Sequence, residues 1–306
     1  LLFSFFLTTI AFSQGNNPYF AVNPAKFNAD DAEIGVYKNP GNNALILISS
    51  KEWGIVKRVN GNDQHFFNYF TVDAKSNKVG KFQRKSNSKF NEGPLCFTPD
   101  GKRVFFTRNS KKKNLATQKR ELMLFTAEVS TKGKWSNITP CNINNKMYSV
   151  GHPAISKEGD YIVFASEAPG GQGGTDLYVA TLDANGTIGD PINLGAKVNT
   201  TGNEFFPWFS PEGQLFFSSN GLKGLGGYDL FVTELKNGKD VFNPMNLEAP
   251  INSAADDIAI VYHEDMKGYM SSNREKNNDN IYSFSQLRPI VFKVIMSGTV
   301  TDLNTN

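Results

Sequence analysis

The sequence predicts an all-β protein that folds as a β-propeller of four-stranded antiparallel blades. Short apolar runs separated by Gly, Asn, Asp and Pro fill the 306 residues, and long runs at helical spacing are scarce. One type of segment recurs five times along the chain. Phe is abundant, with 25 copies, and aromatic side chains bury the most area where flat blades pack together.

The recurring segment is an apolar residue, a Ser or Thr, a tight turn with glycine, and a strongly apolar strand. Its clearest copies are FTPDGKRVFFTRN (97–109), ISKEGDYIVFASE (155–167) and FSPEGQLFFSSN (209–220). Weaker copies are YKNPGNNALILISS (37–50) and YHEDMKGYMSSNR (262–274). The predicted turn glycines, spaced 60, 58, 54 and 55 residues apart, are Gly41, Gly101, Gly159, Gly213 and Gly268. Four-stranded repeats at about this period are typical of propeller blades.

A second pair of strands follows each copy, as in DLYVATLDANGTIGDPINL (176–194) and DLFVTELKNGKDVFNPMNL (229–247). Asn-Gly pairs at 185–186 and 237–238 indicate type I′ turns between these strands. Asp176, Asp229 and Asp279 stand at the head of third strands. We expect these carboxylates to accept hydrogen bonds from the glycine-rich backbone before them, with calcium coordination as the alternative. No cofactor and no metal site is predicted.

The linkers between copies also repeat. Two linkers place an Asn eight residues after a Pro and an acidic residue five positions after that Asn, namely PINLGAKVNTTGNE (191–204) and PMNLEAPINSAADD (244–257). Asn28 and Glu33 have the same five-residue spacing from Asn to acid. The fifth copy ends after its third strand. Residues near 18–23 are therefore predicted to supply its fourth strand and close the ring, which removes exposed sheet edges. Five blades are predicted, or six if residues 51–91 contain another.

The two ends of the chain differ from the repeats. Residues 1–13, LLFSFFLTTIAFS, resemble a secretory signal peptide that lacks its start, which predicts export. Residues 14–287 form the predicted propeller. Residues 288–306 are predicted to begin a further β-sandwich domain. Export permits a disulfide between Cys96 and Cys141, but the apolar run around Cys96 favours buried free thiols.

Several function classes find little support. The net charge of +3 indicates no nucleic-acid partner, and the basic run Lys111–Lys113 predicts a solvated loop, with an electrostatic docking patch as the alternative. His65, His152 and His263 belong to no metal or catalytic motif, and no G-x-S-x-G elbow is present. The glycine-rich loop at 221–228 leads into a strand rather than a helix, so it is not a phosphate loop.

Several of these motifs together carry a family resemblance. Five segments follow one another along the chain: HPAISKEGDYIVFAS (152–166), APGGQGGTDLYVA (168–180), NLGAKVNTTGNEFFPWFS (193–210), SSNGLKGLGGYDLF (218–231) and GYMSSNR (268–274). With them the chain resembles the WD40-like (PD40) propeller region of exported OmpA-family proteins of Gram-negative bacteria. Some of these relatives belong to periplasmic assemblies of type IX secretion and gliding. The resemblance implies a periplasmic, outer-membrane-associated protein, and peptidoglycan binding only through a further C-terminal domain.

One face of such a ring would carry the loops between second and third strands together with the linkers. We expect this face to bind a periplasmic or outer-membrane protein, or a glycan, without catalysis. Its candidate residues are Gly173, Gly174, Asn199, Glu204, Phe206, Trp208, Gly226, Gly227 and Tyr228. A propeller hydrolase or lyase acting on carbohydrate or peptide is the first alternative. A calcium-dependent glycan-binding module is the second.

Overall fold

The computed structural model describes residues 18–292 except 52–56, 60–61, 65, 74 and 276–277. The predicted signal peptide and His65 lie outside the described residues, as does the predicted further domain from residue 293 onward. The signal peptide and the further domain stay predictions. Within the described ranges, no helix is long and apolar enough to cross a membrane.

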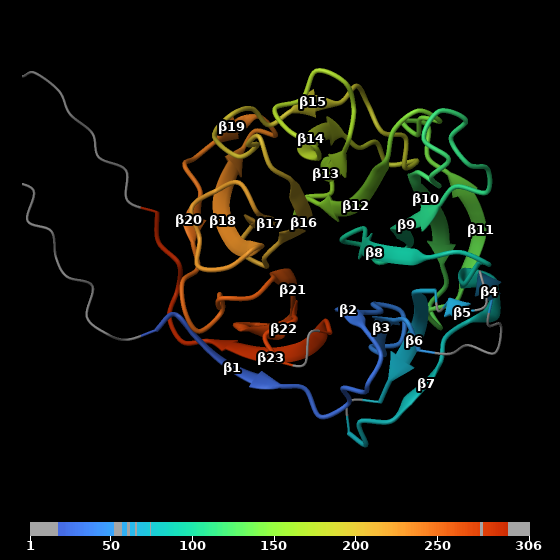
Figure 1. Ribbon diagram of the computed structural model, residues 1–306, viewed down its shortest axis with the longest axis horizontal. Coiled ribbons are helices and arrows are strands. Elements are labelled where there is room, and N and C mark those ends of the chain that lie inside the picture. The colour runs from blue at the N-terminus through green and yellow to red at the C-terminus, as the bar shows by residue number, and fades with distance from the viewer. Residues whose placement is uncertain are drawn as a thin grey trace, which may run out of the picture.

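Five antiparallel sheets, four with four strands and one with five, surround a common centre (Figure 1). Blade 1 consists of β2 (Glu33–Lys38), β3 (Leu45–Ser49), β6 (Asn68–Val72) and β7 (Val79–Lys81). Blade 2 consists of β8 (Glu92–Phe97), β9 (Arg103–Asn109), β10 (Leu122–Val129) and β11 (Trp135–Pro140). Blade 3 consists of β12 (Val150–Ile155), β13 (Tyr161–Ser166), β14 (Asp176–Thr181) and β15 (Ile192–Asn193).

Blade 4 has a divided outer edge. Its strands are β16 (Glu204–Phe209), β17 (Gln214–Ser219), β18 (Asp229–Lys236), β19 (Asp240–Val241) and β20 (Met245–Asn246). Blade 5 consists of β21 (Asp257–Glu264), β22 (Lys267–Ser272), β23 (Asn280–Gln286) and β1 (Phe20–Pro24). The prediction of an all-β propeller with five blades is confirmed. Apart from β6 and β7 of blade 1, the described part of residues 51–91 contains the hairpin of β4 (Lys57–Val59) and β5 (Asn62–Gln64) and the 3-10 turn η1 (Arg84–Ser86). These elements do not make a further blade, so the six-blade alternative was wrong.

The predicted closure by an N-terminal strand is confirmed. β1 pairs antiparallel with β23, from Phe20 opposite Gln286 to Pro24 opposite Tyr282. The Phe20 side chain is fully buried, and its ring meets Phe284 edge-on at 5.7 Å. The ring of blades is therefore closed by residues that are more than 250 positions apart in the sequence.

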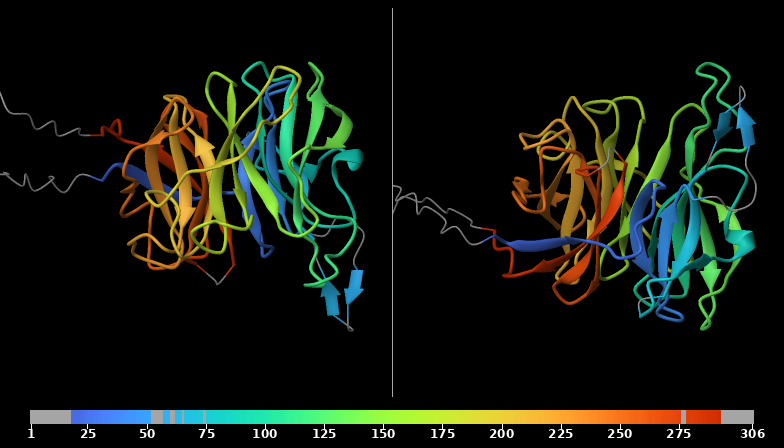
Figure 2. Two further views of the ribbon diagram at one scale, coloured as in Figure 1. Left: turned by 90° about the horizontal axis from the view of Figure 1, so that it is seen from above. Right: turned by 60° about the horizontal axis from the view of Figure 1, so that its bottom comes forward.

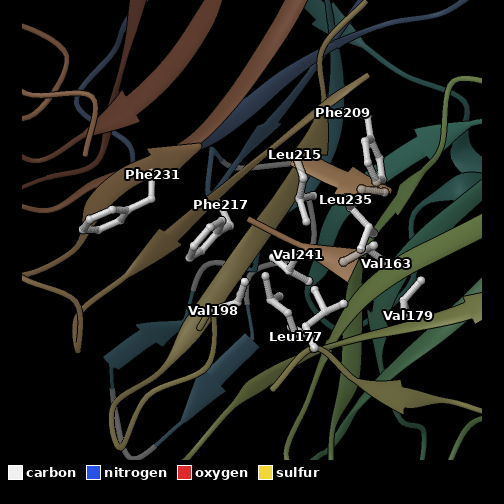
Figure 3. Close-up of a cluster of buried hydrophobic side chains, with 13 residues drawn as sticks. Val163, Leu177, Val179, Val198, Phe209, Leu215, Phe217, Phe231, Leu235 and Val241 are labelled. Carbon is white, nitrogen blue, oxygen red and sulfur yellow. The ribbon is translucent and has the colours of Figure 1, made fainter. Parts of the chain in front are cut away.

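Apolar cores fill the spaces between neighbouring blades. In Figure 3, Val163, Leu177 and Val179 of blade 3 face Leu215 and Phe217 of blade 4. The two cysteines lie in the core between blades 2 and 3, where both are buried and free, so the thiol prediction is confirmed and the disulfide alternative was wrong.

The innermost strand of every blade shifts its register at least once. The shifts fall in β2, β8, β12, β16 and β21. At four of them a residue takes a positive φ, namely Gly35, His152, Phe206 and Ala259. Such bulges bend a strand and increase its twist, so each innermost strand is re-aimed near the axis.

Two predicted repeat positions need correction. Gly101, Gly159 and Gly213 occupy their turns with positive φ, but Gly268 lies inside β22 and Met266 takes the left-handed turn position. A Cβ on Gly268 would lie 2.0 Å from the Val261 carbonyl oxygen, so this glycine permits close packing instead. Asp279 was predicted at the head of the third strand of blade 5, but Asn280 occupies that position. Asn280 pairs with Ser272 in the way that Asp229 pairs with Ser219 in blade 4. The apolar sequence IYSF after Asn280 matches LFVT after Asp229 and would have given this register.

Candidate functional site

The loops between second and third strands of blades 3 and 4 meet the linkers that follow those blades. We call residues 170–175, 198–204, 221–228 and 251–257 the glycine-rich loop surface. The Gly174 amide donates to the Gly202 carbonyl at 2.9 Å, and the Asp257 amide donates to the Tyr228 carbonyl at 2.7 Å. A Cβ on Gly202 would lie 3.0 Å from the Gly221 backbone, so the two pairs also touch and the four segments form one continuous structure across two blade boundaries.

Two buried aspartates hold the glycine-rich loops. Asp176 accepts hydrogen bonds from the backbone amides of Gln172 and Gly173, at 2.5 and 3.1 Å. Asp229 accepts from Leu225 and Gly226 in the same way, at 2.8 and 3.1 Å. This is the contact that the sequence predicted for these carboxylates. Burial raises the pKa of Asp229, and the neighbouring Asp257 and Asp256 raise it further.

The four candidate glycines permit close approach between loop and linker. A Cβ on Gly173 would lie 2.3 Å from the Thr200 carbonyl oxygen, and one on Gly226 would lie 2.0 Å from that of Ala255. Those on Gly174 and Gly227 would collide with the side chains of Asn203 and Asp256. These positions therefore shape the surface, and a bulkier residue there would push the linker away.

A ring of asparagines explains the repeated linker pattern. The Asn199 side chain accepts from the Leu177 amide and donates to the Leu177 carbonyl, at 2.8 and 2.9 Å. The same two-bond clamp on a third strand is made in the other four blades by Asn28, Asn87, Asn144 and Asn252. All five residues come from linkers, so each clamp ties a linker to the blade before it.

An acid stands five residues after four of these asparagines, at the start of the innermost strand. These acids are Glu33, Glu92, Glu204 and Asp257, and all are buried. Glu204 accepts hydrogen bonds from the Thr200 amide and hydroxyl and from the Ser219 hydroxyl, at 3.0, 2.8 and 2.7 Å. Asn199 and Glu204, both predicted on the interaction face, therefore hold the surface in place from beneath.

Aromatic side chains gather where this surface approaches the axis. The His152 ring lies 5.3 Å from that of Phe205 and 4.4 Å from that of Phe206, and Phe205 lies 5.9 Å from Tyr228. Burial lowers the pKa of His152 to about 3, so this imidazole is neutral at physiological pH. Phe206 and Tyr228, both predicted site residues, are half-buried here and accessible to a partner.

Trp208, predicted on the same face, lies elsewhere. It is near the other end of β16, where its ring meets Tyr37 of blade 1 edge-on at 5.9 Å across the axis. It lines a cavity of about 240 Å³ with Lys157, Ser210 and Tyr262. Side chains alternate between the faces of a strand and β16 also contains a bulge, so position along the sequence did not reveal this placement.

The titratable groups offer no metal cage in the described part of the chain, where no group of three or more His, Cys, Asp or Glu could hold an ion. His263 lies apart from the surface in β21, against Tyr269 at 4.9 Å, and burial lowers its pKa to about 4. Asp176, Glu204 and Asp229 accept hydrogen bonds from backbone amides or hydroxyls of these loops, and Asp257 also pairs with Arg274. The arrangement is therefore built to hold loops in a fixed shape.

Comparison with known proteins places this chain by fold. No family model and no curated relative matches it. Among solved structures, a luciferin-regenerating enzyme is 10% identical, with a TM-score of 0.50 over 88% of this chain and 96% of its own. The α-L-arabinofuranosidase of Lactobacillus brevis is 12% identical, with a TM-score of 0.47 over 84% and 90%. TolB of Acinetobacter baumannii is 13% identical, with a TM-score of 0.46 over 84% and 55%. At 10% identity, the likeness to the luciferin-regenerating enzyme shows a common fold alone.

Proposed function

We propose that this chain is a non-catalytic propeller of the periplasm that binds a protein partner through the glycine-rich loop surface. The observation that carries the proposal is what the carboxylates in and directly beneath this surface bind. Asp176, Glu204 and Asp229 are each turned inward to loop amides or hydroxyls. A surface held this rigidly loses little conformational entropy when a partner docks.

The outward side chains fit a protein partner. Leu225 is 56% exposed at the tip of the blade 4 loop, Lys223 is exposed beside it, and the half-buried Tyr228 follows. An exposed apolar group next to an aromatic and a cation is typical of protein interfaces. The predicted export signal and the OmpA-family resemblance support the periplasm and the outer membrane as the setting of this interaction.

The test is quantitative capture from a periplasmic and outer-membrane extract of a Gram-negative host. Leu225→Ser with Tyr228→Ala should lower recovery of the captured protein at least about tenfold, because two central contact side chains are lost. The backbone amide of Leu225 that Asp229 binds is retained in this variant. Ile192→Ser is the matched control, since Ile192 is 59% exposed on β15, outside the surface. Equal capture by all three proteins would refute the proposed surface.

A calcium-dependent glycan-binding module is the second candidate because Asp229 keeps one buried oxygen, Oδ1, without a hydrogen-bond partner among the described residues. Under the proposed function, chelation with EDTA leaves the melting temperature unchanged. A rise in melting temperature with added Ca²⁺ that Asp229→Asn abolishes would favour the calcium module instead.

A hydrolase or lyase is the remaining candidate, and the axial cavity beside Trp208 is the feature that favours it. Turnover of a carbohydrate or peptide substrate that is lost in Lys157→Ala, with unchanged thermal stability, would replace the non-catalytic proposal.

A further inference from the structure

We infer that blade 2 carries a membrane-docking tip that binds anionic lipid surfaces. The tip consists of the loop 110–121 between β9 and β10 and the linker segment 142–149. In both views of Figure 2 the loop projects from the same face as the β4–β5 hairpin. The glycine-rich loop surface belongs to blades 3 to 5 and shares no residue with the tip.

Two large apolar side chains are exposed on the tip. Leu115 is 90% exposed and Met147 is 64% exposed. The Asn114 side chain donates to the Met147 carbonyl at 3.1 Å, so the two apolar residues belong to one site. Two large exposed apolar side chains on segments joined by a hydrogen bond add nothing to the folded core, which points to contact with something outside the molecule.

The loop holds this shape through a buried asparagine. Asn114 is 5% exposed, and its side chain donates to Glu121 Oε1 at 2.8 Å and accepts from the Ala116 amide at 2.9 Å. Its backbone closes the loop, since the Asn114 amide donates to the Lys119 carbonyl at 2.8 Å. Leu115 is therefore presented outward by a fixed turn.

Positive charge surrounds the apolar pair. The exposed cations of the two segments are Lys111, Lys112, Lys113, Lys119 and Lys146. The one acid within these segments, Glu121, is buried and accepts from Asn114 and Ser149. Glu167, which accepts from the Ser149 amide, is the exposed carboxylate that contacts the tip. Five lysines against one exposed carboxylate make the tip strongly cationic.

The shape and the charge together favour a lipid surface over a protein groove. Leu115 is 90% exposed in the middle of a projecting loop, whereas a docked peptide needs a concave site with apolar walls. An apolar tip that enters the headgroup region, with lysine side chains reaching the phosphates around it, is the arrangement of interfacial anchors. The expected ligand is therefore a bilayer with anionic headgroups.

The experiment is flotation of the full chain with phosphatidylcholine vesicles that contain phosphatidylglycerol, compared with phosphatidylcholine alone. We expect binding to the anionic vesicles only, and a loss of binding as the salt concentration rises. Lys111→Gln, Lys112→Gln and Lys113→Gln together should weaken partitioning about a hundredfold, since each lysine near such a surface contributes about a factor of five. Leu115→Ser with Met147→Ser should weaken it about a hundredfold, since two large apolar side chains are lost.

Matched controls come from other parts of the surface. Lys132→Gln, Lys134→Gln and Lys157→Gln remove three exposed lysines on the opposite face, and Ile192→Ser removes an exposed apolar residue elsewhere. Both control variants should float like the wild type, and all variants should keep its melting temperature. Wild-type protein that floats with neither vesicle overturns the inference. Tip variants that float like the wild type overturn it as well.

Discussion

Replacement of Phe20 by Ala tests whether the closing strand stabilises the whole ring. The Phe20 side chain is fully buried between Phe284 and the core of blades 4 and 5. Loss of a buried Phe costs about 3–5 kcal/mol, because the transfer free energy of the ring is lost and a cavity remains. Domains of this kind have a free energy of unfolding of about 5–15 kcal/mol, so this one change removes a large share of it.

The assay is urea unfolding followed by circular dichroism and by fluorescence, with Phe217→Ala as the reference. Phe217 is also fully buried, but in the central strand β17 of blade 4. If β1 is as firmly docked as an internal strand, both variants lose about 4 kcal/mol. Asn23→Ala, at an exposed position of β1, should match the wild type. A loss below about 1 kcal/mol for Phe20→Ala alone would mean that β1 detaches easily, and the closure reasoning would fail.

Three further predictions concern charge, thiols and packing. Burial, followed by the neighbouring Asp31, raises the pKa of Glu33 from 4.5 to about 8. The folded protein therefore favours the protonated form of this side chain. The stability that Glu33 contributes is present below pH 4.5 and is lost as the pH rises through 8, by about 1.4 kcal/mol per pH unit. Glu33→Gln should therefore gain stability relative to the wild type between pH 5 and 8 in urea titrations, and a pH-independent difference would contradict this. Burial raises the pKa of Cys141 to about 12 and that of Cys96 well above its usual range, so a thiol reagent at pH 8 should label neither until urea unfolds the chain; rapid native labelling would argue against the buried placement. Gly268→Ala should cost about 3 kcal/mol because its Cβ would meet the Val261 carbonyl, whereas Gly213→Ala, at a φ of +87° in open space, should cost about 1 kcal/mol; the reverse order in thermal melts would refute this assignment.

The sequence by itself determined the fold class, the number of blades and the closure of the ring. Each of these follows from local patterns that repeat. The turn glycines 101, 159 and 213 mark tight turns, and the third strands begin at Asp176 and Asp229 as expected. The linker spacing from Asn199 to Glu204 was visible as a pattern, although its purpose was not. Repetition lets weak local signals add up, which is why one sequence was enough to predict the fold class, the blade number and the closure.

Tertiary structure decided where the side chains of those patterns go. Trp208 follows Phe206 by two residues, yet β16 contains a bulge between Phe205 and Trp208. Trp208 therefore lies at the axis, whereas Phe206 lies among the aromatic side chains near the glycine-rich loop surface. Gly268 was predicted as a turn residue because its neighbour in space, Val261, was not known. Leu115 and Met147 meet through Asn114 although they are 32 positions apart. The physical reason is common to all three, since the burial and contacts of a side chain depend on strands and loops that only the folded ring brings together.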